Sequence, residues 1–183
     1  MNYLLTGEET ERLKFRRPEE KDFPIWKTFF EHPLSAKFVG FDTNATAEEC
    51  CRTWFDRGIY RFENNLGGMN ALINKHTSDF IGMAGLLIQE IDGGQKLEIG
   101  YSMLPEYWNK GYASEAAIKC RNYAFENELS NEIISIIHPE NFGSMKVAAN
   151  NGMTLYKTTQ FKGNTVNIFR ITRQEWEQMK VKS

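Results

Sequence analysis

Apolar side chains alternate with polar ones, or form short runs, along much of the chain, and these patterns predict its strands. Leu13 and Phe15 alternate with basic residues, as in a half-buried strand. Farther on, three apolar runs are separated by turn-forming segments at 76–79 and 92–94, which predicts an antiparallel meander. The predicted strands are 12–17, 69–73, 80–91, 97–103, 132–138, 155–160 and 165–171.

Helical spacing and end signals predict the helices. Thr46 and Glu49 have the spacing of a capping box, Asn141 can cap a later helix, and Gly152 suits the left-handed position after that helix. The predicted helices are 18–30, 46–62, one from 113, one from 141 with Met145, Ala148 and Ala149 facing inward, and a short one from 172; residues 31–45 are predicted to be loop. Small side chains form a stripe that would let the third helix lie close to a sheet, at Ala113, Ala116, Ala117, Cys120, Tyr123 and Ala124.

The order of these elements predicts an α/β (α+β) fold. Its centre would be a mixed, mostly antiparallel sheet of about seven strands with helices on both faces. The chain shows no internal repeat, low-complexity stretch or long linker, so we expect a single domain over residues 1–183.

Composition and charge exclude several classes of protein. The formal net charge of −2 gives no basic field for nucleic acid, and no apolar run approaches the ~18 residues that cross a bilayer. The N-terminus lacks the pattern of a signal peptide. The three cysteines (Cys50, Cys51 and Cys120) and three scattered histidines favour neither a disulfide framework nor a zinc site. We therefore expect a reduced, cytoplasmic protein that needs no metal, as a monomer or homodimer.

The segment 97–114 carries the strongest functional signal. An apolar strand ends in a turn with Pro105, and a short loop then passes through Gly111 and Ala113 into a helix. Unpaired backbone N–H groups at the start of a helix, with the positive end of its dipole behind them, suit a phosphorylated ligand. A simple turn without a ligand is the alternative.

The segment 97–116, followed by 138–144 and by Asn151-Gly152-Met153, resembles the GNAT superfamily of acyl-CoA N-acyltransferases. The stretch 108–116 is similar to the branch of ribosomal-protein N-terminal acetyltransferases. The resemblance spans about residues 11–178. The loop pattern of the family places Trp108 first, Gly111 fourth and Ala113 sixth, and Asn109 stands where this branch usually has Gly. Because Asn tolerates left-handed backbone, we expect the loop to form.

The resemblance implies where acetyl-CoA, the co-substrate, would bind. Backbone amides from Asn109 to Ser114 would hold the diphosphate, and the backbone N–H of Met103, five residues before Trp108, would bind the thioester carbonyl and then the oxyanion. For Met103, core packing of the side chain is compatible with this role. The implied coenzyme-binding residues are Met103, Trp108, Asn109, Lys110, Gly111, Tyr112, Ala113, Ser114 and Asn141.

The resemblance also implies roles for two polar residues after the central strand. Asn141 would bond the pantetheine arm, or alternatively cap a helix. Many members of the family carry a Tyr seven residues after this Asn, where this chain has Ala148. Ser144 would then donate a hydrogen bond to the leaving sulfur, because a hydroxyl is a poor proton source at its pKa. An ordinary residue of the first helical turn is the alternative for Ser144.

The general base is less sharply indicated. Glu98 is the first candidate, since strand alternation puts it on one face with Gly100 and Ser102, although strand carboxylates are commonly solvated. His138 ends the central strand with a suitable ordinary pKa but has no evident partner. The remaining candidates, Tyr101 and Tyr107, more often serve in packing.

Together these features predict an acetyl-CoA-dependent N-acetyltransferase. A primary amine, either of a protein N-terminus or of a small molecule, would attack in a ternary complex. The resemblance implies that residues 30–60 form the variable wall on the acceptor side. The aromatic residues of this region and of the preceding helix would serve either a pocket or the core; they are Trp26, Phe38, Phe41, Trp54 and Tyr60. A non-catalytic acyl-CoA sensor or scaffold with the same fold is the alternative. A nucleotide-binding module is disfavoured because the loop lacks the Gly-Lys-Ser/Thr ending.

Overall fold

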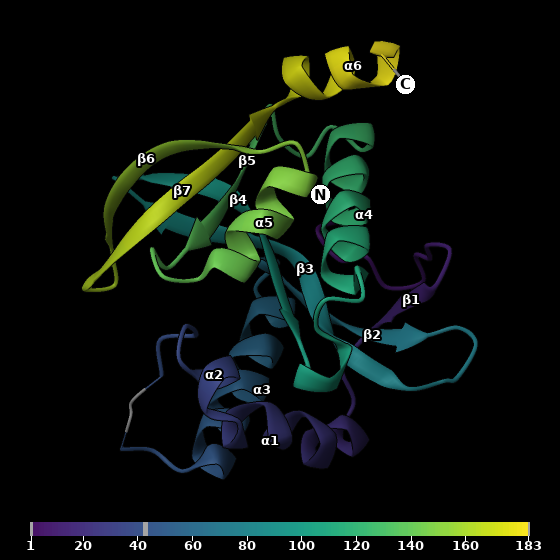
Figure 1. Ribbon diagram of the computed structural model, residues 1–183, viewed down its shortest axis with the longest axis vertical. Coiled ribbons are helices and arrows are strands. Elements are labelled where there is room, and N and C mark those ends of the chain that lie inside the picture. The colour runs from purple at the N-terminus through teal and green to yellow at the C-terminus, as the bar shows by residue number, and fades with distance from the viewer. Residues whose placement is uncertain (1, 42–43, 183) are drawn as a thin grey trace.

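The computed structural model describes residues 2–41 and 44–182, and its centre is a seven-stranded sheet (Figure 1). The strand order is β1-β2-β3-β4-β5-β7-β6, in which β4 and β5 run parallel and every other pair is antiparallel. This confirms the predicted mixed sheet. The strands are β1 (Leu13–Arg16), β2 (Gly67–Asn74), β3 (Phe80–Ile91), β4 (Gly94–Met103), β5 (Glu132–Ile137), β6 (Thr154–Phe161) and β7 (Asn164–Thr172).

The helices cover both faces of this sheet, as predicted. They are α1 (Phe23–Glu31), α2 (Pro33–Ala36), α3 (Ala47–Glu63), α4 (Tyr112–Glu126), α5 (Phe142–Asn150) and α6 (Arg173–Lys182), with 3-10 turns at Glu20–Asp22 and Pro105–Tyr107. Figure 1 shows α1, α2 and α3 grouped at one end of the molecule, with α4 and α5 side by side beyond them.

Each helix group packs against one face of the sheet and forms its own apolar core there. The small-residue stripe of α4 is fully buried at Ala116, Ala117, Cys120 and Ala124, where it packs with Leu97 and Ile99 of β4. Small side chains allow this close approach of helix and sheet. On the other face, the aromatic residues of α1 pack with α3 and with β3, around the fully buried Trp26. Alternation along β4 therefore points Leu97 and Ile99 toward α4, and Glu98 toward α3.

Several predicted helix ends are confirmed. The Thr46 hydroxyl accepts the Glu49 N–H, and the Glu49 carboxylate accepts the Thr46 N–H, which together form the capping box. The Asn141 side chain accepts the Ser144 N–H at the start of α5. Beyond α5, Gly152 has a φ of 77°, the left-handed conformation that glycine adopts without strain.

The predicted start of the first helix at Pro18 is wrong, because α1 begins at Phe23 after a 3-10 turn. The physical reason is Asp22. Its carboxylate accepts the Glu19 N–H at 2.8 Å and the Arg16 guanidinium at 2.6 Å, so it caps the turn and is tied to β1. A side chain engaged in this way holds the chain out of the helix that local spacing favours.

Two smaller predictions also fail. Part of the predicted loop 31–45 is helix α2, which is fastened by the Ser35 hydroxyl donating to the Phe29 carbonyl; residues 42–43 lie outside the described residues. On α5, Ala148 is buried and Met145 half-buried as predicted, but Ala149 is exposed.

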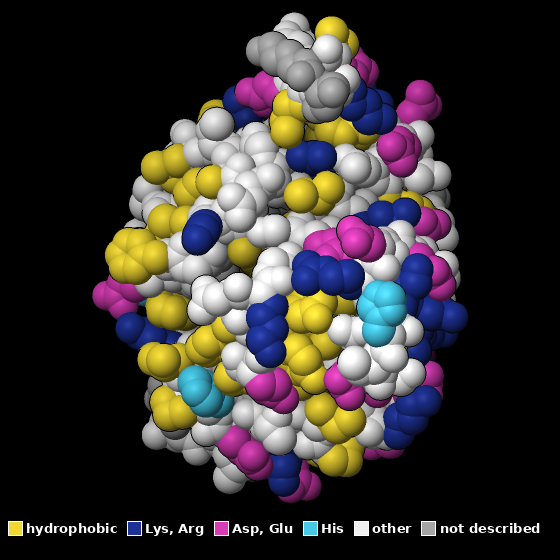
Figure 2. All heavy atoms as spheres, turned by 45° about the vertical axis from the view of Figure 1, so that its right-hand side comes forward, with side chains coloured by type: hydrophobic (Ala, Val, Ile, Leu, Met, Phe, Trp, Pro, Cys, Tyr) yellow, Lys and Arg dark blue, Asp and Glu magenta, His cyan; other side chains and the backbone are white. Residues whose placement is uncertain are grey.

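The surface carries charges of both signs. Figure 2 shows Lys and Arg side chains interspersed with Asp and Glu, which agrees with the net charge of −2. Within residues 2–41 and 44–182, none of the helices combines the length and apolar character that a membrane span requires.

Candidate functional site

The loop between β4 and α4 contains two left-handed residues close together. Asn109 has a φ of 58° and Gly111 a φ of 83°. Asn109 therefore adopts the left-handed conformation that Asn was expected to tolerate at this position. Gly111 precedes the first residue of α4, and no side chain caps this helix. The Glu115 N–H donates to the Gly111 carbonyl at 3.0 Å. The N–H groups of 112–114 precede that bond, so they have no acceptor within the helix and can bind an anion.

Arg12, which directly precedes β1, contacts this loop and holds it against the sheet as a brace. Its Nη1 donates to the Lys110 carbonyl at 3.0 Å, its Nε lies 2.6 Å from the Glu115 carboxylate, and its guanidinium carbon lies 4.3 Å from the centroid of the Tyr112 ring. A Cβ added at Gly111 would lie 3.3 Å from Arg12 Nη2. Arg12 therefore contacts the backbone of the loop at Lys110 and two side chains in the first turn of α4, those of Tyr112 and Glu115.

The Glu115 carboxylate completes this brace. Burial raises its pKa, but hydrogen bonds from the Thr10 hydroxyl and from the N–H and guanidinium of Arg12 outweigh burial, and the pKa is lowered. The sequence did not indicate Arg12 or Glu115, because 103 residues separate them.

A gap opens between the parallel strands β4 and β5. Among the described residues, their pairing comprises only Leu97 with Ile133 and Glu98 with Ile134. Where the strands part, the Ser135 hydroxyl donates to the Ile99 carbonyl at 2.9 Å and replaces one bond of the ladder. Beyond this bond, no strand in the described part of the chain pairs with β4 on that side, although β4 continues to Met103.

Backbone alternation orients the groups that face this gap. The Leu104 N–H donates to the Ile81 carbonyl at 3.0 Å, so Leu104 bonds toward β3. In an antiparallel pair, alternate residues bond to the same neighbour. Tyr101 and Met103 therefore direct their N–H groups away from β3, into the gap. The Trp108 indole donates to the Met103 carbonyl at 2.8 Å, on the same side of the strand as the Met103 N–H. The resemblance had assigned Trp108 to the loop only by position, and this indole contact was not predicted.

The other wall of the gap is the start of α5. The Tyr101 hydroxyl spans from β4 and donates to the Ser144 carbonyl at 2.8 Å. Burial, followed by the charge of Glu98, raises the pKa of Tyr101, which disfavours it as a base. The Ser144 side chain is half-buried, and its hydroxyl has no partner in the part of the chain that the structure describes. The side-chain oxygen of Asn141 caps α5, so Asn141 has the alternative role of a helix cap. Among the described residues, its side-chain nitrogen has no acceptor and can donate to a ligand.

Glu98 lies on the α3 face of β4, and its side chain is half-buried and not fully solvated. The Gln89 amide donates to it at 2.6 Å. Burial raises the pKa of Glu98 above its ordinary value of 4.5, and the Gln89 bond, the Arg61 charge and the Ile136 N–H lower it by less. A carboxylate with a raised pKa is a stronger base than a solvated one.

The other candidates for a base are held in packing contacts. His138 accepts the Glu140 N–H through Nδ1 at 3.1 Å, and its ring lies 5.1 Å from that of Phe38. The Tyr107 ring packs with its centroid 6.0 Å from that of Tyr112.

The cysteines are not candidates for a nucleophile. Burial raises the pKa of both Cys51 and Cys120 to about 12, which makes them inert thiols.

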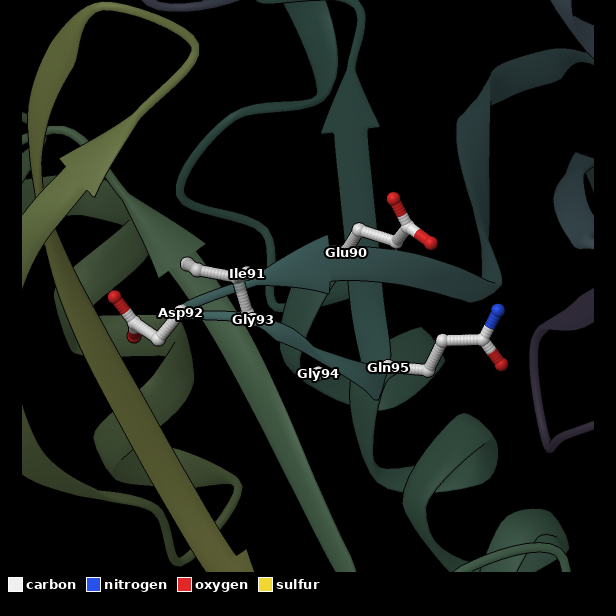
Figure 3. Close-up of a pocket in the computed structure, with 6 residues that line it drawn as sticks. All are labelled: Glu90, Ile91, Asp92, Gly93, Gly94 and Gln95. Atoms are coloured by element: carbon white, nitrogen blue, oxygen red, sulfur yellow. The ribbon is translucent and has the colours of Figure 1, made fainter.

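A hollow at the β3–β4 turn lies away from these groups. Its volume is about 360 Å³, and it is lined by residues 90–95 (Figure 3). Glu90 and Gln95 point away from Asp92, and Asp92 is paired with Lys157 at 2.7 Å. Because β4 runs from this turn to Met103, the hollow lies at the opposite end of the strand from the loop 108–114.

Comparisons with known proteins agree with this geometry. The model of the acetyltransferase (GNAT) domain matches residues 12–154. The uncharacterized protein YkkB of Bacillus subtilis is 36% identical over 153 residues, which cover 81% of this chain and 86% of YkkB. The crystal structure of an acetyltransferase from Agrobacterium tumefaciens superposes with a TM-score of 0.75 at 25% identity, covering 90% of this chain and 92% of that one.

A third comparison is with a structure that contains coenzyme A. RimL, a ribosomal L7/L12 α-N-protein acetyltransferase solved in complex with coenzyme A, superposes with a TM-score of 0.72 and covers 91% of this chain and 97% of its own. At 15% identity this likeness concerns the fold alone. The family match spans most of the chain. The chain belongs to the GNAT family and is an acetyl-CoA-dependent N-acetyltransferase.

Proposed function

We propose that the protein transfers the acetyl group of acetyl-CoA to a primary amine, of a small molecule or a protein N-terminus, by direct attack in a ternary complex. One observation carries the proposal: the Met103 and Tyr101 N–H groups face a gap between β4 and β5. A pantetheine arm can pair with such a strand edge. The Met103 N–H then bonds the thioester oxygen, where one donor contributes a factor of about 10²–10³ in rate.

The loop and the helix start would hold the diphosphate of the coenzyme. Backbone N–H groups of 109–114 supply the donors, and Gly111 carries no side chain that would obstruct approach. Asn141 offers its amide nitrogen to the pantetheine arm. The residues present therefore fit a coenzyme bound mainly by main chain.

The acetyl transfer needs a proton acceptor and support for the sulfur. The amine nitrogen bonds to the carbonyl carbon as the carbon–sulfur bond breaks, and the thiolate leaves. Glu98 takes the amine proton directly or through water, because its raised pKa suits a base. The Ser144 hydroxyl, which has no hydrogen-bond partner among the described residues, donates a hydrogen bond to the departing sulfur.

Thiol release from acetyl-CoA, with and without a panel of amines, tests the proposal. One arm holds small amines and the other holds ribosomal-protein N-terminal peptides, and a mass shift of one acetyl group identifies the acceptor. We expect amine-dependent thiol release. Binding of acetyl-CoA in calorimetry without release for any amine would instead favour a sensor or scaffold.

A further inference from the structure

A cavity of about 490 Å³ lies on the α3 face of the sheet, a size that suits a small organic ligand. The second half of α3, strands β2 and β3, and the tip of the β6–β7 hairpin contribute to its walls. Much of the lining is apolar and includes Phe41, Trp54, Met69 and Leu87.

Four cationic side chains also line this cavity: Arg17, Arg57, Arg61 and Lys162. Within residues 2–41 and 44–182, none of the four has a carboxylate at ion-pair distance. The two acidic residues of the rim already have partners. Glu19 pairs with Lys21 at 2.6 Å, and Glu20 pairs with Arg52 at 2.9 Å.

The cations are arranged against aromatic rings and against each other. Arg57 lies 4.9 Å from the Phe41 ring centroid. Desolvation by neighbouring atoms lowers the pKa of Lys162, the charges of Arg61 and Arg57 lower it further, and the charge of Glu98 raises it by less. Burial likewise lowers the pKa of Arg61; the charge of Glu98 opposes this shift, and the charge of Arg57 adds to it by less. The Arg61 guanidinium also donates to the backbone carbonyls of Leu66 and Ile88 and to the Gln89 side chain. Like charges brought together in this way repel, and a bound anion would relieve the repulsion.

The cavity adjoins the proposed base. Gln89 lines the cavity and donates to the Glu98 carboxylate. A Cβ added at Gly100 would lie 2.8 Å from Leu87 and 3.0 Å from Met69, so these two lining residues pack directly on β4 beside Glu98. An amine at this end of the cavity therefore lies next to Glu98, with the cations on the surrounding walls.

We propose that the acceptor is a small amine that carries an anionic group, a carboxylate or a phosphate, on an apolar body. The anion binds Arg57 and Lys162, beside the positive charge of Arg61, and the apolar body packs on Trp54 and Phe41. Guanidinium groups suit both anions, since they bond carboxylate and phosphate through paired N–H donors. This inference rests on the proposed acetyl transfer and narrows its acceptor, against the alternative of a protein N-terminus.

Matched amines test it, with kcat/KM measured by thiol release. The pairs are phenylalanine with phenethylamine, 4-(aminomethyl)benzoate with benzylamine, and O-phosphotyramine with tyramine, beside an N-terminal peptide that carries no anionic group. We expect kcat/KM for the anion-bearing member of at least one pair to exceed that for the member without the anionic group by tenfold or more. The pair that responds distinguishes carboxylate from phosphate. Equal or lower kcat/KM for all anionic members, or preference for the peptide, would overturn the inference while leaving acetyl transfer intact.

Two variants connect this preference to the cavity. Both Arg57→Gln and Lys162→Gln replace exposed side chains, so folding is retained. We expect each to lower the anionic-to-neutral ratio of kcat/KM by tenfold or more, whereas Lys180→Gln on α6 makes the same charge change elsewhere and leaves the ratio unaltered. An unchanged ratio in Arg57→Gln would contradict the assignment.

A binding measurement separates the two proposals. Calorimetry with the anionic amines in the presence of coenzyme A detects the cavity without turnover. Binding that Arg57→Gln weakens tenfold, with no acetylation of any amine, would support the cavity assignment while contradicting acetyl transfer. Absence of both binding and turnover for anionic amines would overturn the inference.

Discussion

The Arg12 guanidinium lies 2.6 Å from the Glu115 carboxylate and joins the edge strand of the sheet to the first turn of α4. The same guanidinium donates to the Lys110 carbonyl. The pair therefore connects β1 to the loop that we assign to the coenzyme diphosphate. The Glu115 side chain is only 17% exposed, so its interactions are less screened by water than those of a surface pair.

This relationship predicts how stability depends on pH. The pKa of Glu115 is lowered in the folded protein, so its contribution is full above its ordinary pKa of 4.5 and is lost as pH falls through the lower folded value. Glu115→Gln should reduce the free energy of unfolding at pH 7 by about 1 kcal/mol and by less at acidic pH. Urea unfolding at several pH values measures this. The control Glu126→Gln, whose pair with Lys180 is over half exposed, should change little; equal effects of the two variants would contradict the brace.

The loop assignment predicts the effect of a charge at Gly111. Gly111→Glu adds a side chain at a left-handed residue and a negative charge where the diphosphate would bind. Calorimetry with acetyl-CoA should show a loss of affinity of at least about 10²-fold, from strain of about 1–2 kcal/mol together with repulsion. Gly93→Glu is a matched control, since Gly93 has a φ of 76°, open space around it and a place at the opposite end of β4. Full affinity in Gly111→Glu would remove the loop from the binding site.

Much of the fold could be predicted because its signals are local. Strand alternation and capping residues such as Thr46 act over a few positions, and the structure uses them as the sequence indicates. The start of α1 could not be predicted, since Asp22 is held by Arg16 of a separate strand. Tertiary contacts of this kind override local helix signals.

The candidate site divides in the same way. The loop around Gly111 has a local pattern and was predicted, whereas the Arg12–Glu115 brace spans 103 residues and was not. The cavity lined by cationic side chains has no local signal in the sequence either. Arg57 and Arg61 have the i,i+4 spacing that places them on one helix face, but nothing in the sequence indicates that Lys162 on a distant hairpin faces the same cavity.

The role proposed for Ser144 predicts a change in turnover without a change in binding. Ser144→Ala removes a hydroxyl that has no other partner among the described residues, so kcat should fall by about 10- to 100-fold while the affinity for acetyl-CoA stays nearly constant. Ser144→Thr keeps a hydroxyl and should recover part of the rate. Equal kcat in Ser144→Ala and the unaltered protein would exclude Ser144 from the mechanism.

The raised pKa of Glu98 predicts the pH dependence of the reaction. The carboxylate accepts a proton only when ionised, so kcat/KM should rise with pH through the pKa of Glu98, which lies above its ordinary 4.5. Glu98→Gln has nearly the same shape and cannot take the proton, so it should remove this limb of the profile and lower kcat by about 10²-fold. Its affinity for acetyl-CoA should be retained, because the side chain points to the α3 face, away from α4. Superimposable pH profiles would show that water or another group is the base.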